Sequence, residues 1–323
     1  MQFNMRMTAT ASAVLAFAGI LAGCNKAAPP APSSSAPASA AASGDAQIVK
    51  LASVAPMSGS QAHYGKDNAN GVQMAVDELN KQGMVIGGKK VRFEAVIEDD
   101  GADPKQGTAV AQKLCDAKVN GVVGHLNSGT TIPASKVYND CGLPMVTGAA
   151  TNPALTKPGY KTTFRIIAND NALGAALADE AKAMGLKRVA VIDDRTAYGQ
   201  GLAEVFADVA KKNGLEVVSQ QFTNDKATDF MAILTEIKAK KPDSIFYGGM
   251  DAQAAPMLRQ IEQLGMGNVK FFGGDGICTA EIYKLSGESK AVNNVFCAVG
   301  GGALEKMAGG PAWKARYDAA FPG

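Results

Sequence analysis

Short runs of β-branched and other apolar residues alternate with longer segments of helical periodicity from Ile48 onward. The runs that predict strands are 48–54, 91–97, 119–123, 143–146, 188–192, 215–219, 244–247, 269–272 and 294–298. The segments that predict helices are 67–81, 104–116, 132–139, 171–184, 201–213, 229–240 and 252–264. Strands that are separated by a helix pair in parallel, so the alternation predicts an α/β fold with parallel sheets and crossover helices.

The chain is long enough for two such units. Its 323 residues exceed what a single core usually serves, and the alternation pauses over 147–170. Near the end of this segment we expect the chain to cross between two lobes, through a hinge of a few loop residues. The predicted parts are a first lobe over 46–168, a second lobe over 169–297 and a return to the first lobe over 298–323.

The N-terminal segment has a different composition from the rest. An apolar stretch at 8–20 follows Arg6; it is too short to span a bilayer and is typical of an export signal. The residues before Cys24 resemble the lipobox of bacterial lipoproteins, which predicts a signal peptide over 1–23 and a lipid on Cys24. An apolar segment followed by an unrelated cysteine is the alternative. Residues 24–45 comprise this cysteine and a segment almost entirely of Ala, Pro, Ser and Gly, which predicts a flexible tether.

The composition argues against several classes of function. Hydrophobic residues make up 46% and charged residues 19% of the chain, and the formal net charge is +2, so no disordered protein and no nucleic-acid-binding surface is expected. The two histidines, His63 and His125, lack the neighbours of a zinc site, and neither a Gly-x-Ser-x-Gly elbow nor a complete dinucleotide fingerprint occurs. The sequence predicts a binding protein and not an enzyme, with no metal and no cofactor.

Four cysteines remain if Cys24 carries a lipid. Export would place them in an oxidising compartment, where an even number suggests two disulfides. The pairs Cys115 with Cys141 and Cys278 with Cys297 each join neighbouring segments of one predicted lobe. Free buried thiols are the alternative.

Ligands of open parallel sheets bind at the carboxyl ends of the strands, so the loops after the strands carry the candidate site. Tyr64 follows the first strand and could form a wall of a pocket. Ser128 lies in a glycine-containing loop that lacks the lysine of a phosphate loop and leads into a helix, whose N-terminus suits a single carboxylate. The small residues Ala149, Ala150 and Thr151 follow the fourth strand. An ordinary turn at Tyr64 and a plain helix cap at Ser128 are the alternatives.

The second half of the chain supplies three further candidates after its strands. Tyr198 could close over a ligand, Met250 follows a Gly-Gly pair, and Asp275 lies between glycines where it could pair with a cationic group. A turn or a helix cap is the alternative for Asp275. An α-amino acid is a zwitterion, and burial of either charge without a partner would cost several kcal/mol. Hydroxyls and amides of one lobe and Asp275 of the other would therefore make lobe closure and binding one event.

The chain resembles the leucine/isoleucine/valine-binding periplasmic receptors over nearly the whole length from Ile48 to about Phe321. The resemblance rests on residues 57–59, 65, 100, 103–106, 123–126, 133–135, 150–153, 198–202, 247–249 and 257–260. It implies a type I periplasmic-binding fold of two Rossmann-like lobes and a partner ABC permease with cytoplasmic ATPase subunits. From the resemblance together with the lipobox-like residues before Cys24, we expect a periplasmic monomer that is anchored to a bacterial membrane only through Cys24.

The resemblance also implies roles for individual residues. It places Ser128 and Thr151 on the ligand carboxylate, with the backbone of Ala149 nearby, and Asp275 on the ammonium. Tyr64 and Tyr198 stand at positions that shape and cover the pocket.

The chain departs from the family in three ways. Ala102 and Asn127 stand where the best-known members have a disulfide, and Met250 replaces an aromatic pocket residue. The family continues past the position of Gly323, so the first lobe is expected to be truncated. A branched-chain or other small apolar amino acid is the predicted ligand; a related small ligand such as an amide, urea or an aromatic acid, and an enzyme of Rossmann type, are the alternatives.

Overall fold

The computed structural model describes residues 46–287 and 289–322. The predicted signal peptide over 1–23, the lipid on Cys24 and the tether up to residue 45 lie outside these residues. Within the described part of the chain, no helix is long and apolar enough to cross a membrane.

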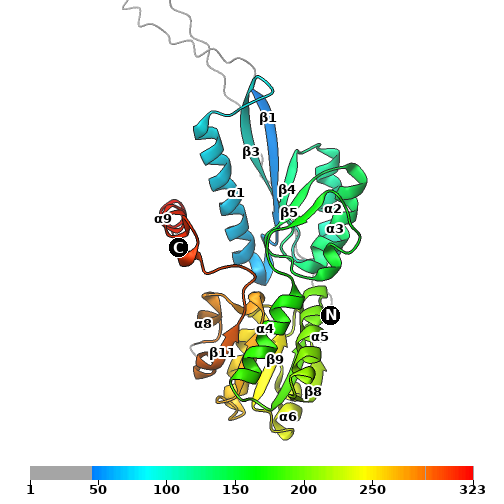
Figure 1. Cartoon of the computed structure of the whole chain (residues 1–323), viewed down its shortest axis with the longest axis vertical. Coiled ribbons are helices and arrows are strands. Elements are labelled where there is room, and N and C mark those ends of the chain that lie inside the picture. The colour runs from blue at the N-terminus through cyan, green and yellow to red at the C-terminus, as the bar shows by residue number, and fades with distance from the viewer. Residues whose placement is uncertain (1–45, 288, 323) are drawn as a thin grey trace, which may run out of the picture. The chain divides into compact units, whose positions relative to one another are not determined.

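The first sheet has six strands in the order β2-β3-β1-β4-β5-β6, and every pair in it is parallel except the β2–β3 hairpin (Figure 1). Its strands are β1 (Gln47–Ala55), β2 (Val85–Ile86), β3 (Lys89–Asp99), β4 (Gly121–Gly124), β5 (Met145–Thr147) and β6 (Thr163–Arg165). Helix α1 (Ala62–Gln82) packs on one face, and α2 (Pro104–Asp116) and α3 (Ser128–Cys141) pack on the other.

The second sheet has five strands in the order β11-β10-β9-β7-β8, all parallel. Its strands are β7 (Arg188–Asp193), β8 (Glu216–Phe222), β9 (Ser244–Gly248), β10 (Lys270–Gly273) and β11 (Val295–Cys297). Helices α4 (Asp170–Ala183) and α5 (Ala197–Lys212) cover one face, and α6 (Met231–Ala239), α7 (Asp251–Gln263) and α8 (Glu281–Leu285) cover the other.

The central strand β9 explains why the second sheet is apolar on both faces. All five of its residues are buried. Phe246 packs into the core under α4 and α5, whereas Ile245 and Tyr247 pack into the core under α6 and α7, because successive side chains of a strand point to opposite faces. A parallel sheet that is covered by helices on both faces needs such continuous apolar strands.

All nine predicted strands are present, and the parallel α/β fold is confirmed. The strands β2 and β6 were not predicted: the two residues of β2 are both exposed and β6 has one buried residue among its three, so neither shows a run of buried apolar residues. Helix α3 begins at Ser128 and not at residue 132, since its first turn is made of small polar residues that carry no apolar periodicity.

The chain leaves the first sheet after β6 and enters the second unit with α4. After β11, helix α9 (Gly310–Ala320) contacts α1 of the first unit. The Nε of Arg316 lies 3.0 Å from Glu78 Oε1, and the hydroxyl of Tyr317 lies 3.1 Å from Asp67 Oδ1. We call the unit of the first sheet lobe 1 and the unit of the second sheet lobe 2.

Both predicted disulfides are present. Cys115–Cys141 joins the C-terminal turns of α2 and α3, with the Cα atoms 6.1 Å apart. Cys278–Cys297 joins the loop after β10 to the end of β11, with a Cα separation of 5.6 Å. The second bridge lies three residues after Asp275 and so fixes a loop that carries a predicted site residue.

Candidate ligand-binding site

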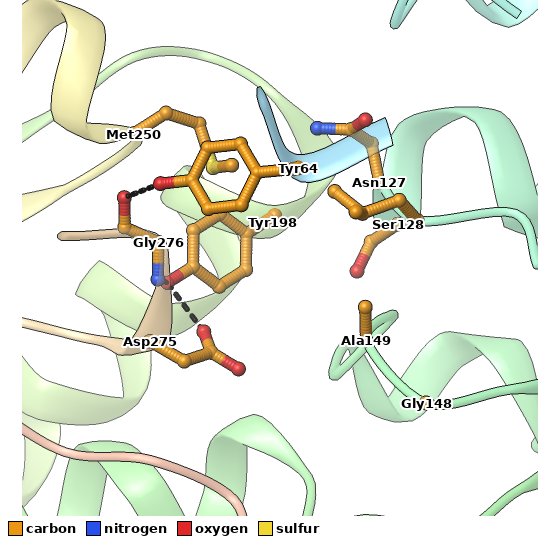
Figure 2. A pocket seen from close by; sticks show the side chains of 10 residues that line it. Tyr64, Asn127, Ser128, Gly148, Ala149, Tyr198, Met250, Asp275 and Gly276 are labelled. Carbon is orange, nitrogen blue, oxygen red and sulfur yellow. Dashed lines mark hydrogen bonds between the residues drawn. The ribbon is translucent and has the colours of Figure 1, made fainter. Parts of the chain in front are cut away.

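A cavity of about 220 Å³ lies between loops of both lobes (Figure 2). Its lining consists of Tyr64, Leu126, Asn127, Ser128, Gly148, Ala149, Tyr198, Met250, Asp275 and Gly276. Lobe 1 contributes the start of α1 and the loops after β4 and β5; lobe 2 contributes the starts of α5 and α7 and the loop after β10. The loops after β4, β5 and β10 lie at the carboxyl ends of parallel strands, where ligands of such sheets bind.

Six of the eight predicted site residues line this cavity: Tyr64, Ser128, Ala149, Tyr198, Met250 and Asp275. The other two, Ala150 and Thr151, are buried next to the loop that lines it. Four lining residues were not predicted, namely Leu126, Asn127, Gly148 and Gly276. Each of these is adjacent in sequence to a predicted residue or one residue removed from it, so a reading of whole loops could have found them.

The lobe 1 side of the cavity is the N-terminus of α3. The first N–H groups of a helix have no acceptor within the helix and carry a partial positive charge. Ser128, the first residue of α3, adds a hydroxyl that accepts a hydrogen bond from the backbone N–H of Asn152 at 3.2 Å. Because the hydroxyl accepts this bond, its own proton remains available for a ligand oxygen.

The neighbouring loop after β5 is held by Thr147. Its hydroxyl accepts hydrogen bonds from the N–H groups of Ala149 at 3.1 Å and Ala150 at 3.0 Å and donates to the carbonyl of His125 at 2.8 Å. These bonds fix the small residues of the loop beside Ser128. A ligand can therefore approach the backbone closely on this side.

The lobe 2 side carries a buried carboxylate. The hydroxyl of Tyr198 donates to Asp275 Oδ1 at 2.8 Å and accepts from the N–H of Gly276 at 3.0 Å. Burial raises the pKa of Asp275, although the bonds from Tyr198 and Gly276 lower it. A buried carboxylate with a raised pKa gains from any cation that enters the cavity.

Tyr64 reaches across from lobe 1 to the same loop. Its hydroxyl donates to the carbonyl of Gly276 at 2.8 Å. Burial raises the pKa of Tyr64 well above the usual range, and the nearby charge of Asp251 raises it further. The phenol therefore stays protonated and remains a donor.

Tyr198 is positioned by the start of α5. The side chain of Thr196 caps this helix by accepting from the N–H of Gly199 at 2.9 Å, and its own hydroxyl donates to Asp194 at 2.7 Å. A Cβ at Gly199 would lie 2.3 Å from the carbonyl oxygen of Gly248, so only glycine allows α5 to begin so close to the end of β9. This close approach brings the Tyr198 ring over the cavity.

Asp170 is a residue of this region that the sequence reasoning missed. Its side chain is fully buried, and neither carboxylate oxygen has a hydrogen-bond partner among the described residues. Burial raises its pKa to about 7; the hydroxyl of Thr151 lowers it, and the charge of Asp275 raises it. The signal was the pair Asn169-Asp170 at a helix start: Asn169 already caps α4, which leaves Asp170 for another role.

The comparisons with known proteins agree with this geometry. A family model described as periplasmic binding protein matches residues 48–323. A Leu/Ile/Val/Thr-binding protein of Salmonella typhimurium is 36% identical over 245 residues, which is 76% of this chain and 66% of that protein. A Leu/Ile/Val-binding protein of Rhizobium johnstonii is 37% identical over 251 residues, or 77% of this chain and 66% of that protein.

Solved structures give the same result. A leucine-binding protein from Thermotoga maritima has a TM-score of 0.69 at 30% identity, covering 75% of this chain and 67% of that one. A branched-chain amino acid transporter substrate-binding protein from Streptococcus pneumoniae, in complex with isoleucine, has a TM-score of 0.76 at 28% identity, covering 86% and 78%. The chain spans just under two thirds of the length of the curated relatives named above. The prediction of a binding protein and not an enzyme is confirmed at the level of the family: the chain belongs to the periplasmic binding proteins.

Proposed function

We propose that this protein captures an α-amino acid with a small apolar side chain, a branched-chain amino acid above all, and delivers it to an ABC importer. The observation that carries the proposal is that a buried carboxylate and the N-terminus of a helix face the same small cavity. Figure 2 draws Asp275 and Tyr198 on one side and Ser128 and Ala149 on the other. A carboxylate and a helix N-terminus that face one cavity match the two charges of a zwitterion.

The ligand carboxylate would lie at the start of α3, where it accepts from the free N–H groups and from the hydroxyl of Ser128. The ammonium would lie against Asp275, with Asp170 as a second carboxylate close by. Thr151, whose buried hydroxyl has no hydrogen-bond partner among the described residues, lies near Asp170. Such charge-assisted hydrogen bonds offset the free-energy cost of removing both charges of the ligand from water.

The rest of the cavity suits an apolar side chain. Leu126, Met250 and the Tyr64 ring supply apolar surface. A volume of about 220 Å³ is below the range of drug-sized pockets, which favours a ligand with few atoms. The names of the relatives support the same class, since they are said to bind leucine, isoleucine and valine.

We also propose that binding closes the two lobes. Hydrogen bonds beside the cavity already link them: Tyr64 to the carbonyl of Gly276 at 2.8 Å, and Asn152 Nδ2 to the carbonyl of Ala197 at 2.5 Å. A ligand that contacts both lobes adds its own bonds only in the closed state, and so shifts the population toward it. The hinge would lie between β6 and α4.

The raised pKa of Asp170 predicts that affinity depends on pH. Without ligand, Asp170 is protonated below its pKa of about 7, whereas a bound ammonium favours the ionised form. Binding then releases a proton, so the affinity for leucine should fall as the pH drops below 7, by roughly tenfold per unit for one proton. Titration calorimetry between pH 5 and pH 8 in buffers of different ionisation enthalpy measures both the slope and the proton release.

The stability of the ligand-free protein should show the opposite sign. The folded pKa of Asp170 lies above the value of about 3.9 for an unfolded aspartate. The stability that this group contributes is therefore fully present below a pH of about 3.9 and is lost as the pH rises through about 7.

An affinity for leucine that does not change between pH 5 and pH 8 would rule out Asp170 as an ammonium partner. Asp170→Asn should remove most of the dependence of the affinity on pH.

We further propose that the protein is exported, carries a lipid on Cys24 and works as a monomer with a permease and its ATPase subunits. The sequence before Cys24 and the Ala- and Pro-rich segment after it support the anchor. Labelled fatty acid should be incorporated into the protein when it is expressed in a bacterium with lipoprotein processing. Cys24→Ala should abolish the label and release the protein from the membrane fraction; a labelled Cys24→Ala protein would contradict the assignment.

Titration calorimetry with leucine, isoleucine, valine and a panel of charged and polar amino acids tests the proposed function. We expect saturable binding of the apolar members and none of the acidic ones, whose side chains would add a third charge to an apolar cavity. No binding of any amino acid by folded protein would refute the proposal.

A further inference from the structure

His63 in the first turn of α1 makes a direct contact between the lobes away from the ligand cavity. Its Nε2 lies 2.9 Å from Oδ2 of Asp251, the first residue of α7. We propose that His63 is a latch: it holds lobe 1 on lobe 2 in the closed state and thereby positions the loop that carries Asp275. This inference rests on the proposed function, since it assigns a positioning residue to the same binding event.

The burial of Asp251 makes the contact strong. The Asp251 side chain is fully buried, whereas the His63 side chain is 31% exposed. Oδ2 accepts from His63 and, at 2.6 Å, from the hydroxyl of Thr279, while Oδ1 has no hydrogen-bond partner among the described residues. A buried carboxylate with so few donors depends on each of them. The N-terminus of α7 adds a favourable field but no substitute for the bond from lobe 1.

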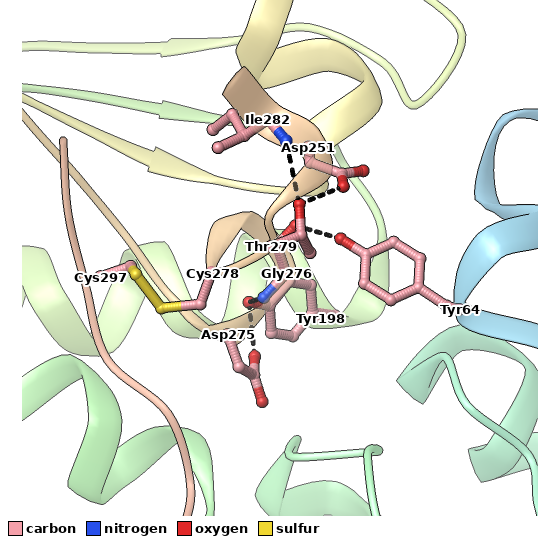
Figure 3. The surroundings of a disulfide bond; sticks show 9 residues. All are labelled: Tyr64, Tyr198, Asp251, Asp275, Gly276, Cys278, Thr279, Ile282 and Cys297. Carbon is pink, nitrogen blue, oxygen red and sulfur yellow. Dashed lines mark hydrogen bonds between the residues drawn. A yellow bond between two sulfur atoms is a disulfide. The ribbon is translucent and has the colours of Figure 1, made fainter. Parts of the chain in front are cut away.

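A short path joins this contact to the binding loop. Thr279, which donates to Asp251, lies four residues after Asp275 in the same loop and also accepts from the N–H of Ile282 at 3.2 Å (Figure 3). Next to it, the Cys278–Cys297 bridge ties the loop to β11. The His63 contact therefore acts on the segment 275–279, which the disulfide already fixes to lobe 2.

Tyr64, the residue after His63 in α1, makes a second contact with the same loop. The His63 and Tyr64 rings lie 4.1 Å apart between centroids, and the Tyr64 hydroxyl donates to Gly276, the residue after Asp275. Two adjacent residues of α1 thus contact two ends of one loop, at Gly276 directly and at Thr279 through Asp251. Of the two, Tyr64 lines the ligand cavity and His63 does not, so His63 acts on the ligand through the loop and not by contact.

The test compares full-length wild type, His63→Ala, His63→Gln and Lys66→Ala. Lys66 lies one turn further along α1 and, like His63, lines a second cavity between the lobes. No hydrogen bond joins its side chain to lobe 2 among the described residues, so it is the matched control. Leucine dissociation is followed by stopped flow, and hydrogen exchange of the segment 275–279 is followed with and without leucine. Loss of the bond should speed leucine dissociation by roughly tenfold, the factor that corresponds to about 1.4 kcal/mol.

We expect His63→Ala to release leucine faster and to exchange faster in 275–279, with the unfolding temperature of the ligand-free protein unchanged. His63→Gln, which keeps a donor, should recover most of both effects, and Lys66→Ala should match wild type. A purely structural role would instead lower the unfolding temperature and leave dissociation as in wild type. Equal dissociation and equal exchange in wild type and His63→Ala would overturn the latch. If wild type binds no amino acid, the proposed function fails, and the exchange of 275–279 alone decides on the latch.

Discussion

Replacement of Asp275 by asparagine is expected to weaken leucine binding at least about 100-fold. The ammonium would lose its charged partner in a buried site, which costs about 3 kcal/mol or more. The shape of the side chain and the bond from the Tyr198 hydroxyl can remain, so the variant removes charge and little else. Titration calorimetry at pH 8 measures the loss.

The stability of the same variant should move in the other direction. Because burial raises the pKa of Asp275, its folded pKa lies above the unfolded value, and the ionised group destabilises the ligand-free fold once the pH exceeds the folded pKa. Asp275→Asn should therefore unfold at the same temperature as wild type at pH 8 or at a higher one. Asp208→Asn, at an exposed position on α5, is the control and should change neither quantity. Tight leucine binding by Asp275→Asn would place the ammonium elsewhere.

Removal of the Cys278–Cys297 bridge is expected to lower both stability and affinity. The bridge closes a segment with a sequence separation of 19, for which the chain-entropy model gives about 3 kcal/mol. It also lies three residues after Asp275, and a looser loop must be ordered again when the ligand binds. We expect the variant with both cysteines changed to alanine to unfold at a lower temperature and to bind leucine roughly tenfold more weakly.

The other bridge provides the matched control. Cys115–Cys141 closes a segment with a separation of 26, so its removal should cost a similar amount of stability, about 3 kcal/mol. It joins the C-terminal turns of α2 and α3, whereas Ser128 lies at the N-terminus of α3. Its double alanine variant should therefore bind leucine as wild type does while it remains folded. An equal loss of affinity in both variants would show a general loss of order and not a role for the loop with Asp275.

The sequence was sufficient for the fold class because the central strands β7, β9 and β10 are buried on both faces. A run such as 244–247 is apolar at nearly every position, and its short length between two helical segments favours a buried strand over a helix. The helix Pro104–Asp116 was predicted with both its ends, since Asp103 accepts from the N–H groups of Lys105 and Gln106 and a proline follows it. Helix-capping signals of this kind can be predicted from the sequence because they depend only on neighbouring residues.

The site was predictable where it follows the strands and not where it depends on contacts between distant residues. Ser128 and Asp275 stand shortly after strands of the two different sheets, so the parallel topology alone placed each of them at the carboxyl edge of its own sheet. Asp170 was missed because the pair Asn169-Asp170 indicated only a helix start, whereas the burial of Asp170 and its proximity to Thr151 and Asp275 appear only in the folded structure. The contact of His63 with Asp251 joins residues 188 positions apart, and the sequence showed only a histidine without zinc-site neighbours.

In the proposed site, one cavity binds both charged groups of an amino acid. The most direct measurement is titration calorimetry of wild type with leucine, with 4-methylpentanoate, which lacks the ammonium, and with 3-methylbutylamine, which lacks the carboxylate. We expect saturable binding of leucine and an affinity at least about 100-fold lower for each analogue, since each leaves one buried charged group of the site without a partner. Binding of 4-methylpentanoate as tight as that of leucine would contradict the pairing of Asp275 with an ammonium and would assign the cavity to a carboxylic acid without an amino group.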